Sequence, residues 1–164
     1  MAIGSLKDVY IDQLQDIYSA CKQSVTITQE LAGAASNEEL TSVLEDGVSG
    51  IHDCMSALEE IIRGHGADPH GEHCKGMEGL VNEARAHGIE EDFSDADAQD
   101  AMIITQYQRM AHYAIAGYGC CKAFAKRLGH DDDARKLDQC LDKSYDGDRR
   151  FTDLAEDKIN RKAA

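Results

Sequence analysis

Four long segments of the chain repeat apolar residues at steps of three and four, the spacing of one face of an α-helix. The first stripe follows Ser5, which can cap a helix N-terminus, and ends near Gly33. Its members are Leu6, Tyr10, Leu14, Ile17, Cys21, Val25, Thr28 and Leu31. The second stripe starts at Ser36 and Glu39, which have the spacing of a capping box, and ends at Gly64. Its members are Leu40, Leu44, Gly47, Val48, Ile51, Met55, Leu58 and Ile62.

Two more amphipathic helices are predicted in the second half of the chain. The third starts at Ser94 and Asp97, another capping-box pair, and runs to about Leu128, with Gly129 as its C-terminal cap. Residues 131–133 are all Asp and place negative charge where the dipole of a fourth helix favours it. The stripe of that helix is Ala134, Leu137, Leu141, Ser144, Asp148, Phe151 and Ala155.

The connections predict how these helices are arranged. The first and third connections are short and force antiparallel neighbours, whereas the middle one can cross the whole bundle. It contains the one long loop, GHGADPHGEHC, and then a short predicted helix, roughly Lys75 to Ala86. One long crossover is typical of ferritin-like bundles. We therefore expect residues 1–164 to form a single all-α domain, a ferritin-like antiparallel four-helix bundle whose long crossover carries a short extra helix.

Composition and charge exclude several classes of protein. Seventeen basic and 31 acidic residues give a formal charge of −14, which repels phosphate backbones and anionic lipid, so we expect no nucleic-acid and no membrane partner. No apolar run approaches the roughly 20 residues that span a bilayer, and the N-terminus lacks an apolar signal core. We therefore expect a cytoplasmic protein whose six cysteines, none of them in a CxxC motif, are reduced thiols.

The core stripes become small or polar at one level when the four helices are aligned by their centres. The residues at this level are Cys21, Ser49, His52, Ala111, His112, Ala114, Ser144 and Asp148. A lone buried carboxylate costs several kcal/mol unless it is paired, so Asp148 either lies at a seam, near solvent or an arginine, or belongs to a site. His112 lies one step off the apolar face, which favours solvent or a seam between helices. Cys21 and His52 are interpreted either as a buried thiol and an interfacial histidine, or as metal ligands.

Five stretches, spread over nearly the whole chain, have more specific patterns. They are LKDVYIDQLQDIYSACKQ at residues 6–23, CKGMEGLVNEA at 74–84, AHYAIAGYG at 111–119, LGHDDDARKL at 128–137 and FTDLA at 151–155. Together they resemble the YciE/YciF family of bacterial ferritin-like proteins. The resemblance implies two metal ions inside the bundle, held by glutamates and Glu-x-x-His pairs, because hard iron or manganese ions prefer oxygen ligands.

The chain departs from this pattern at nearly every ligand position. Other residues stand where the resemblance implies glutamates: Cys21, Ser49, Ala111, Ala114 and Ser144. Only His52 and Asp148 remain, and two such side chains cannot hold two cations. The sequence therefore argues against ferroxidase, oxygenase and catalase chemistry.

The sequence thus favours a ferritin-like protein that has lost its di-iron centre and acts as a non-catalytic, stress-associated binding or structural protein. No catalytic, cofactor-binding or metal-binding residue and no cofactor are expected on this interpretation, and an enzymatic role is not favoured. The family resemblance, together with Val9 and Ile11 outside the main stripe of the first helix, predicts a homodimer, and an unknown protein partner is possible.

Two alternatives remain open. A single Zn or Fe ion could be held by Cys21, His52 and Asp148, three ligands that leave one coordination position free. Thiol redox chemistry could use the cysteines that lie on or near core faces, Cys21, Cys54 and Cys140, with Cys120 and Cys121 close by. The loop residues His65, His70, His73 and Cys74 are expected to form no dedicated metal site.

Overall fold

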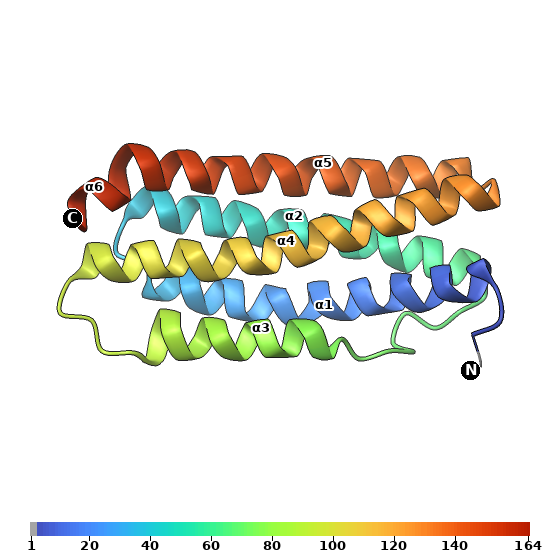
Figure 1. Cartoon of the computed structure of the whole chain (residues 1–164), viewed down its shortest axis with the longest axis horizontal. Coiled ribbons are helices and arrows are strands. Elements are labelled where there is room, and N and C mark those ends of the chain that lie inside the picture. Colours follow the sequence, from blue (N-terminus) through green and yellow to red (C-terminus); the bar gives the residue numbers. More distant parts are fainter. Residues whose placement is uncertain (1–2) are drawn as a thin grey trace.

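Five helices account for most of the structure, a computed structural model that describes residues 3–164 (Figure 1). They are α1 (Leu6–Ala34), α2 (Glu38–Gly64), α3 (Lys75–Arg85), α4 (Ala96–Leu128) and α5 (Asp131–Leu154). A π-helical turn, Ala86–Glu90, extends α3, and a second one, Ala155–Ile159, leads from α5 into α6 (Asn160–Lys162). The predicted all-helical chain is confirmed, with boundaries close to those expected.

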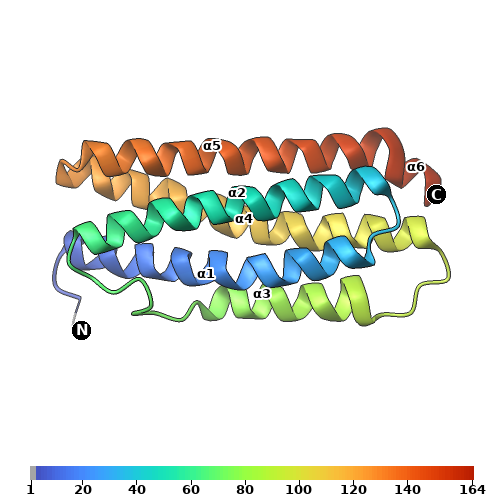
Figure 2. The ribbon, with the colours of Figure 1, turned by 180° about the vertical axis from the view of Figure 1, so that it is seen from behind.

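The four long helices form an antiparallel bundle (Figures 1 and 2). Helix α1 packs against α2 and α4, and α5 packs against the same two helices, so α1 and α5 lie diagonally opposite. The crossover from α2 to α4 returns along the outside of the bundle, where α3 packs against α1 and α4. This is the predicted bundle with a long crossover carrying a short helix. Within residues 3–164, no helix combines the length and the apolar character needed to cross a membrane.

Two apolar clusters fill the two ends of the bundle. One contains Leu14, Leu58 and Leu137, and the other contains Leu31 and Phe151, all of them at most 1% exposed. Burying such side chains contributes about 1.5 to 3 kcal/mol each before entropy is counted. The level between the clusters is the small and polar level seen in the sequence.

The outer faces of the helices expose few large apolar side chains. Ile11, one of the two residues that suggested a dimer, packs against the core of its own chain. Among the described residues, the large apolar side chains that are exposed are Ile3, Leu6 and Tyr145. The homodimer therefore stays a prediction that rests on the family resemblance.

Two of the helix caps lie one residue from their predicted positions. Ser5 caps α1 by accepting from the Asp8 N–H, and Gly129 ends α4 at φ 79°, both as predicted. In contrast, Asn37 rather than Ser36 caps α2, and Asp95 rather than Ser94 caps α4. For α2 the reason is tertiary, because a residue of α4 engages the Ser36 hydroxyl.

That residue is Asp100, a fully buried carboxylate of α4. One of its oxygens accepts from the Ser36 backbone N–H at 2.8 Å. The other accepts from the Ser36 hydroxyl at 2.6 Å and from the Asn37 N–H at 3.0 Å. Three donors stabilise the buried charge, which in turn attaches the α1–α2 turn to α4.

Replacing Asp100 with alanine should therefore lower the free energy of unfolding by about 2 to 4 kcal/mol, because the charged acceptor is lost and buried donors are left without partners. Urea unfolding followed by circular dichroism measures the change. The matched control is Asp92→Ala, since Asp92 is an exposed carboxylate just before the same helix. Equal effects of the two substitutions would contradict a structural role for Asp100.

Candidate functional site

A cavity of about 460 Å³ lies between the two apolar clusters and is lined by all four long helices. Its wall includes all five residues that stand at implied glutamate positions: Cys21, Ser49, Ala111, Ala114 and Ser144. The exposed residues of its lining all belong to α2 and α5, so its mouth lies between these two helices. The residues that sequence reasoning identified as replaced metal ligands thus line one open cavity.

The α2 wall of the cavity differs in detail from the prediction. The side of α2 that lines the cavity includes Gly47, Gly50 and Cys54. Ser49 is instead exposed at the mouth, and its hydroxyl donates to the Glu45 carbonyl. A Cβ at Gly50 would meet no neighbouring atom within 4 Å, whereas a Cβ at Gly47 would meet the Tyr107 hydroxyl at 2.6 Å. Gly50 therefore leaves space in the α2 wall, and Tyr107 fills the space beside Gly47.

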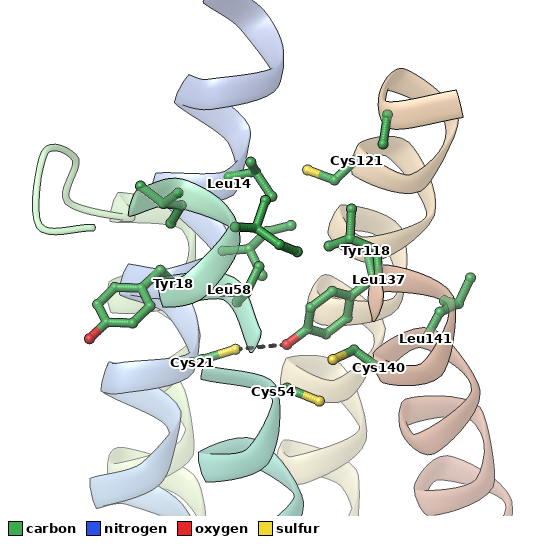
Figure 3. Close-up of a cluster of buried hydrophobic side chains, with 14 of the residues drawn as sticks. Leu14, Tyr18, Cys21, Cys54, Leu58, Tyr118, Cys121, Leu137, Cys140 and Leu141 are labelled. Carbon is green, nitrogen blue, oxygen red and sulfur yellow. Dashed lines mark hydrogen bonds between the residues drawn. The ribbon is translucent and has the colours of Figure 1, made fainter. Parts of the chain in front are cut away.

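Buried thiols and one tyrosine form the polar end of the cavity (Figure 3). The Cys21 sulfur lies 3.1 Å from the Tyr118 hydroxyl. Burial raises the pKa of the Cys21 thiol to about 12, so this thiol is neutral at physiological pH. Cys54 and Cys140 lie close to this pair, and the interaction between the two thiols lowers the pKa of Cys54 and raises that of Cys140.

Thr28 supplies the one unsatisfied polar group of the cavity wall. Its side chain is 0% exposed, and among residues 3–164 its Oγ1 is the sole buried side-chain nitrogen or oxygen without a hydrogen-bond partner. Ser24, one turn earlier, is also buried, but its hydroxyl donates to the Ala20 carbonyl at 2.8 Å. A buried hydroxyl without a partner costs about 1 to 3 kcal/mol, so the unpaired Thr28 hydroxyl destabilises this part of the wall.

Two ion pairs join α2 and α5 at the mouth of the cavity. Arg150 lies 2.9 Å from an Asp46 oxygen, and Lys143 lies 2.9 Å from an Asp53 oxygen. Side chains of both pairs are exposed, and exposed ion pairs are worth only about 0 to 1 kcal/mol. They can therefore rearrange at little cost when a molecule enters.

The carboxylates around the cavity do not fit a centre of two metal ions. Asp46, Asp53 and Asp146 lie at the exposed mouth, where each is paired with a cation. The deeper wall presents thiols, hydroxyls and alanine methyl groups. Two hard cations need bridging carboxylates between them, and this set of side chains supplies none at depth.

The three residues of the predicted single-ion alternative do not meet. Cys21 is buried in the cavity wall, but His52 is exposed and is not part of the cavity lining. Asp148 lies on the α4–α5 seam, where its Oδ2 is 3.1 Å from His112 Nε2 and its Oδ1 accepts from the Gln108 amide at 3.0 Å. Asp148 is thus a seam residue, although its partners are a histidine and a glutamine rather than an arginine. The structure therefore does not bring together Cys21, His52 and Asp148, the three ligands of the single-ion alternative.

The loop histidines are also separated by the fold. His70 packs edge-on against Tyr18, and His73 bonds to Glu78 of α3 at 3.0 Å. Cys74 caps α3. His65 instead points to the α4–α5 turn, where it meets His130 and Asp133. Sequence reasoning missed this grouping, although the antiparallel order already places the end of α2 beside that turn.

The cysteines differ sharply in exposure. Of six free thiols, only Cys120 is exposed, and its neighbour Cys121 is fully buried. Burial raises the pKa of Cys121 to about 12. Cys54, whose pKa is lowered, is only 4% exposed. A redox role that needs accessible thiolates therefore has little support from this arrangement.

Comparison with known proteins places the whole chain in one group. The family model described as "Domain of unknown function (DUF892)" matches residues 5–164. Protein YciF of Escherichia coli K12 is 31% identical over 164 residues, which cover 99% of this chain and 98% of YciF.

Solved structures agree with this placement. The crystal structure of the E. coli stress protein YciF superimposes with a TM-score of 0.89 at 30% identity, covering 96% of this chain and 99% of that one. YcfI of Rhodopseudomonas palustris, whose description proposes a structural role, has a TM-score of 0.86 at 29% identity and covers 92% of this chain and 94% of its own. A Xanthomonas campestris protein shares the fold at 16% identity, with a TM-score of 0.75, and covers 96% of this chain and 95% of its own.

The thiol environments predict that only one cysteine reacts quickly in the folded protein. At pH 8, Ellman's reagent should react with Cys120 in a first, fast phase. The other five thiols should react only after unfolding, because they are buried and four of them have a raised pKa. Cys120→Ser should abolish the fast phase. A fast phase that survives in this variant would instead support thiol chemistry at Cys54.

Proposed function

The chain belongs to the DUF892 family, and on this premise we propose that it is a ferritin-like bundle that has lost its di-metal centre and binds a small, mainly apolar molecule in the vacated cavity. The observation that carries the proposal is the coincidence of the cavity with the replaced ligand positions, Cys21, Ala111, Ala114 and Ser144 among them. At positions where the resemblance implies glutamates, short side chains provide no carboxylate ligand and also occupy less of the core volume.

The size and lining of the cavity support the class of ligand. A volume of about 460 Å³ lies within the usual range of small-molecule sites, roughly 300 to 1,000 Å³. Much of the wall is apolar, with Val43, Met77, Met110 and Phe151 around one end. The Thr28 hydroxyl has no hydrogen-bond partner, and the Tyr118 hydroxyl lies 3.1 Å from the Cys21 sulfur. The best match is a compact apolar molecule with one hydroxyl or carbonyl group.

The charges at the mouth support a neutral ligand. Asp46, Asp53, Lys143 and Arg150 neutralise one another in pairs, so the entrance attracts neither anions nor cations strongly. Inside, no described charged side chain is available to balance an ionised ligand. The free-energy cost of burying an unpaired charge would far exceed the free energy gained from apolar contacts in the cavity.

The wider setting of this function follows from relatives and composition. YciF is described as a stress protein, and we extend a stress-associated, non-catalytic role to this chain. The acidic composition and the free thiols support a cytoplasmic location without nucleic-acid or membrane partners. A homodimer, or binding of another protein, remains compatible with this role.

Filling the cavity should abolish binding of an apolar probe. We expect 1-aminoanthracene, a neutral fluorophore with one amine, to bind the native chain with increased fluorescence. Ala111→Leu with Ala114→Leu should weaken binding at least tenfold, because the new side chains occupy the cavity. Ala116→Leu is the matched control, since Ala116 lies exposed on the outer side of the same helix.

A second variant tests the unpaired hydroxyl of Thr28. Thr28→Val keeps the shape of the side chain and should stabilise the ligand-free protein by about 1 kcal/mol, because it removes an unpaired buried hydroxyl. Probe binding that is unchanged by filling the cavity, together with a destabilising Thr28→Val, would contradict the proposal.

The proposal also predicts that the bundle centre cannot assemble a dinuclear site. Crystals soaked with Fe²⁺ should show no pair of anomalous peaks about 3 to 4 Å apart in the cavity, because no buried carboxylate is present there to bridge two ions. A chelator should likewise leave probe binding unchanged. Two such peaks beside Cys21 and Ser144 would contradict the loss of the centre.

A further inference from the structure

Two histidines and an aspartate meet at the end of the bundle where α2 ends and α4 turns into α5. Their ligand atoms all lie within 4.8 Å of one another, and within residues 3–164 no other group of three metal-ligating side chains does so. His65 Nε2 is 2.8 Å from Asp133 Oδ2, and the rings of His65 and His130 are 4.6 Å apart. The side chains of His65 and Asp133 are only 13% and 19% exposed.

Helix ends hold these side chains in place. His65 is the C-cap residue of α2, and its backbone N–H bonds to carbonyls of the last turn. His130 follows Gly129, whose left-handed conformation turns the chain, and its N–H bonds to the Ala125 carbonyl at 2.9 Å. Asp133 lies in the first turn of α5. Residues from the ends of three long helices thus converge on one point.

Tyr10 of α1 supports this group from inside the bundle. Its side chain is fully buried, and its hydroxyl donates to Asp133 Oδ2 at 3.2 Å. Its ring also packs against those of His65 and His130, with centroids 5.6 and 6.2 Å away. A ligand carboxylate oriented by a second side chain is typical of metal sites.

We propose that His65, His130 and Asp133 form a site for one divalent transition metal ion such as Zn²⁺, which links the end of α2 to the α4–α5 turn. Two imidazoles and one carboxylate suit Zn²⁺, and three protein ligands leave a fourth position for water. Ligand atoms at about 2.0 to 2.2 Å from the ion lie a little over 3 Å apart in a tetrahedron, so the His65–Asp133 contact has to lengthen by only about half an ångström.

The surroundings favour a dication. Glu60, Asp131 and Asp132 border the group, and the nearby Lys136 is paired with Glu60 at 2.7 Å. The summed charge near the site is therefore negative. The site lies beyond the apolar cluster of Leu14 and Leu58, away from the central cavity, and its three ligands are not part of the cavity lining. It does not depend on the function proposed for the cavity.

Zinc titration of the full, untagged chain tests the inference. Calorimetry at pH 7.5 should give one Zn²⁺ per chain, and saturating Zn²⁺ should raise the melting temperature by several degrees. Co²⁺ in place of Zn²⁺ should give the intense visible absorption of a tetrahedral ion. His65→Gln, His130→Gln and the isosteric Asp133→Asn should each weaken binding at least tenfold. Tyr10→Phe should weaken it about tenfold or less, because it removes only the orienting hydrogen bond.

Control variants separate this site from surface binding. His52→Gln and His73→Gln change exposed histidines outside the group and should leave the affinity and stoichiometry unchanged. Circular dichroism verifies that each variant is folded, and Asp133→Asn keeps the test valid if a histidine variant is unstable. No binding, or binding that survives Asp133→Asn and His65→Gln but is lost in a control variant, would overturn the proposal. Zn²⁺ should also leave 1-aminoanthracene binding in the cavity unaltered.

Discussion

A carboxylate can remain in the middle of a helical bundle only if something nearby compensates its charge, and this constraint explains the arrangement of acidic residues in the protein. In a di-metal bundle the ions provide the compensation. Here the implied glutamate positions carry residues without charge, and the remaining Asp148 lies on a seam beside His112. Asp100, the one fully buried carboxylate among residues 3–164, has three hydrogen-bond donors of its own. Within residues 3–164, a fully buried carboxylate thus occurs only where hydrogen-bond donors compensate its charge.

Small side chains at the implied glutamate positions also affect the shape of the core. Apolar clusters fill the bundle on both sides of this level. Between them the small side chains line a cavity. Its wall includes Thr28, whose buried hydroxyl has no hydrogen-bond partner, and two balanced ion pairs border its mouth.

The cluster of His65, His130 and Asp133 follows from a different feature, the meeting of helix ends. Chain reversals bring helix caps and polar side chains together at one end of a bundle. The buried Tyr10 hydroxyl donates a hydrogen bond to Asp133 of this cluster. An ion bound there would strengthen the contact between the two helical hairpins, α1–α2 and α4–α5. It would do so at the periphery, where solvent lowers the cost of carrying charge.

The sequence by itself determined the helices, their order and the level at which the core becomes small and polar. These features depend on local periodicity and on residue size, and Cys21, Ala111, Ala114 and Ser144 do surround one cavity as the alignment of helix centres implied. Only the tertiary structure decided where individual polar side chains point. A periodic stripe defines a face of a helix, but a rotation of a few tens of degrees decides whether a residue enters the core, a seam or solvent. Asp148 lies on a seam and His52 is exposed. Contacts such as His65 with Asp133, or Ser36 with Asp100, join residues more than 60 positions apart, and their partners are set by the packing of whole helices rather than by the neighbouring sequence.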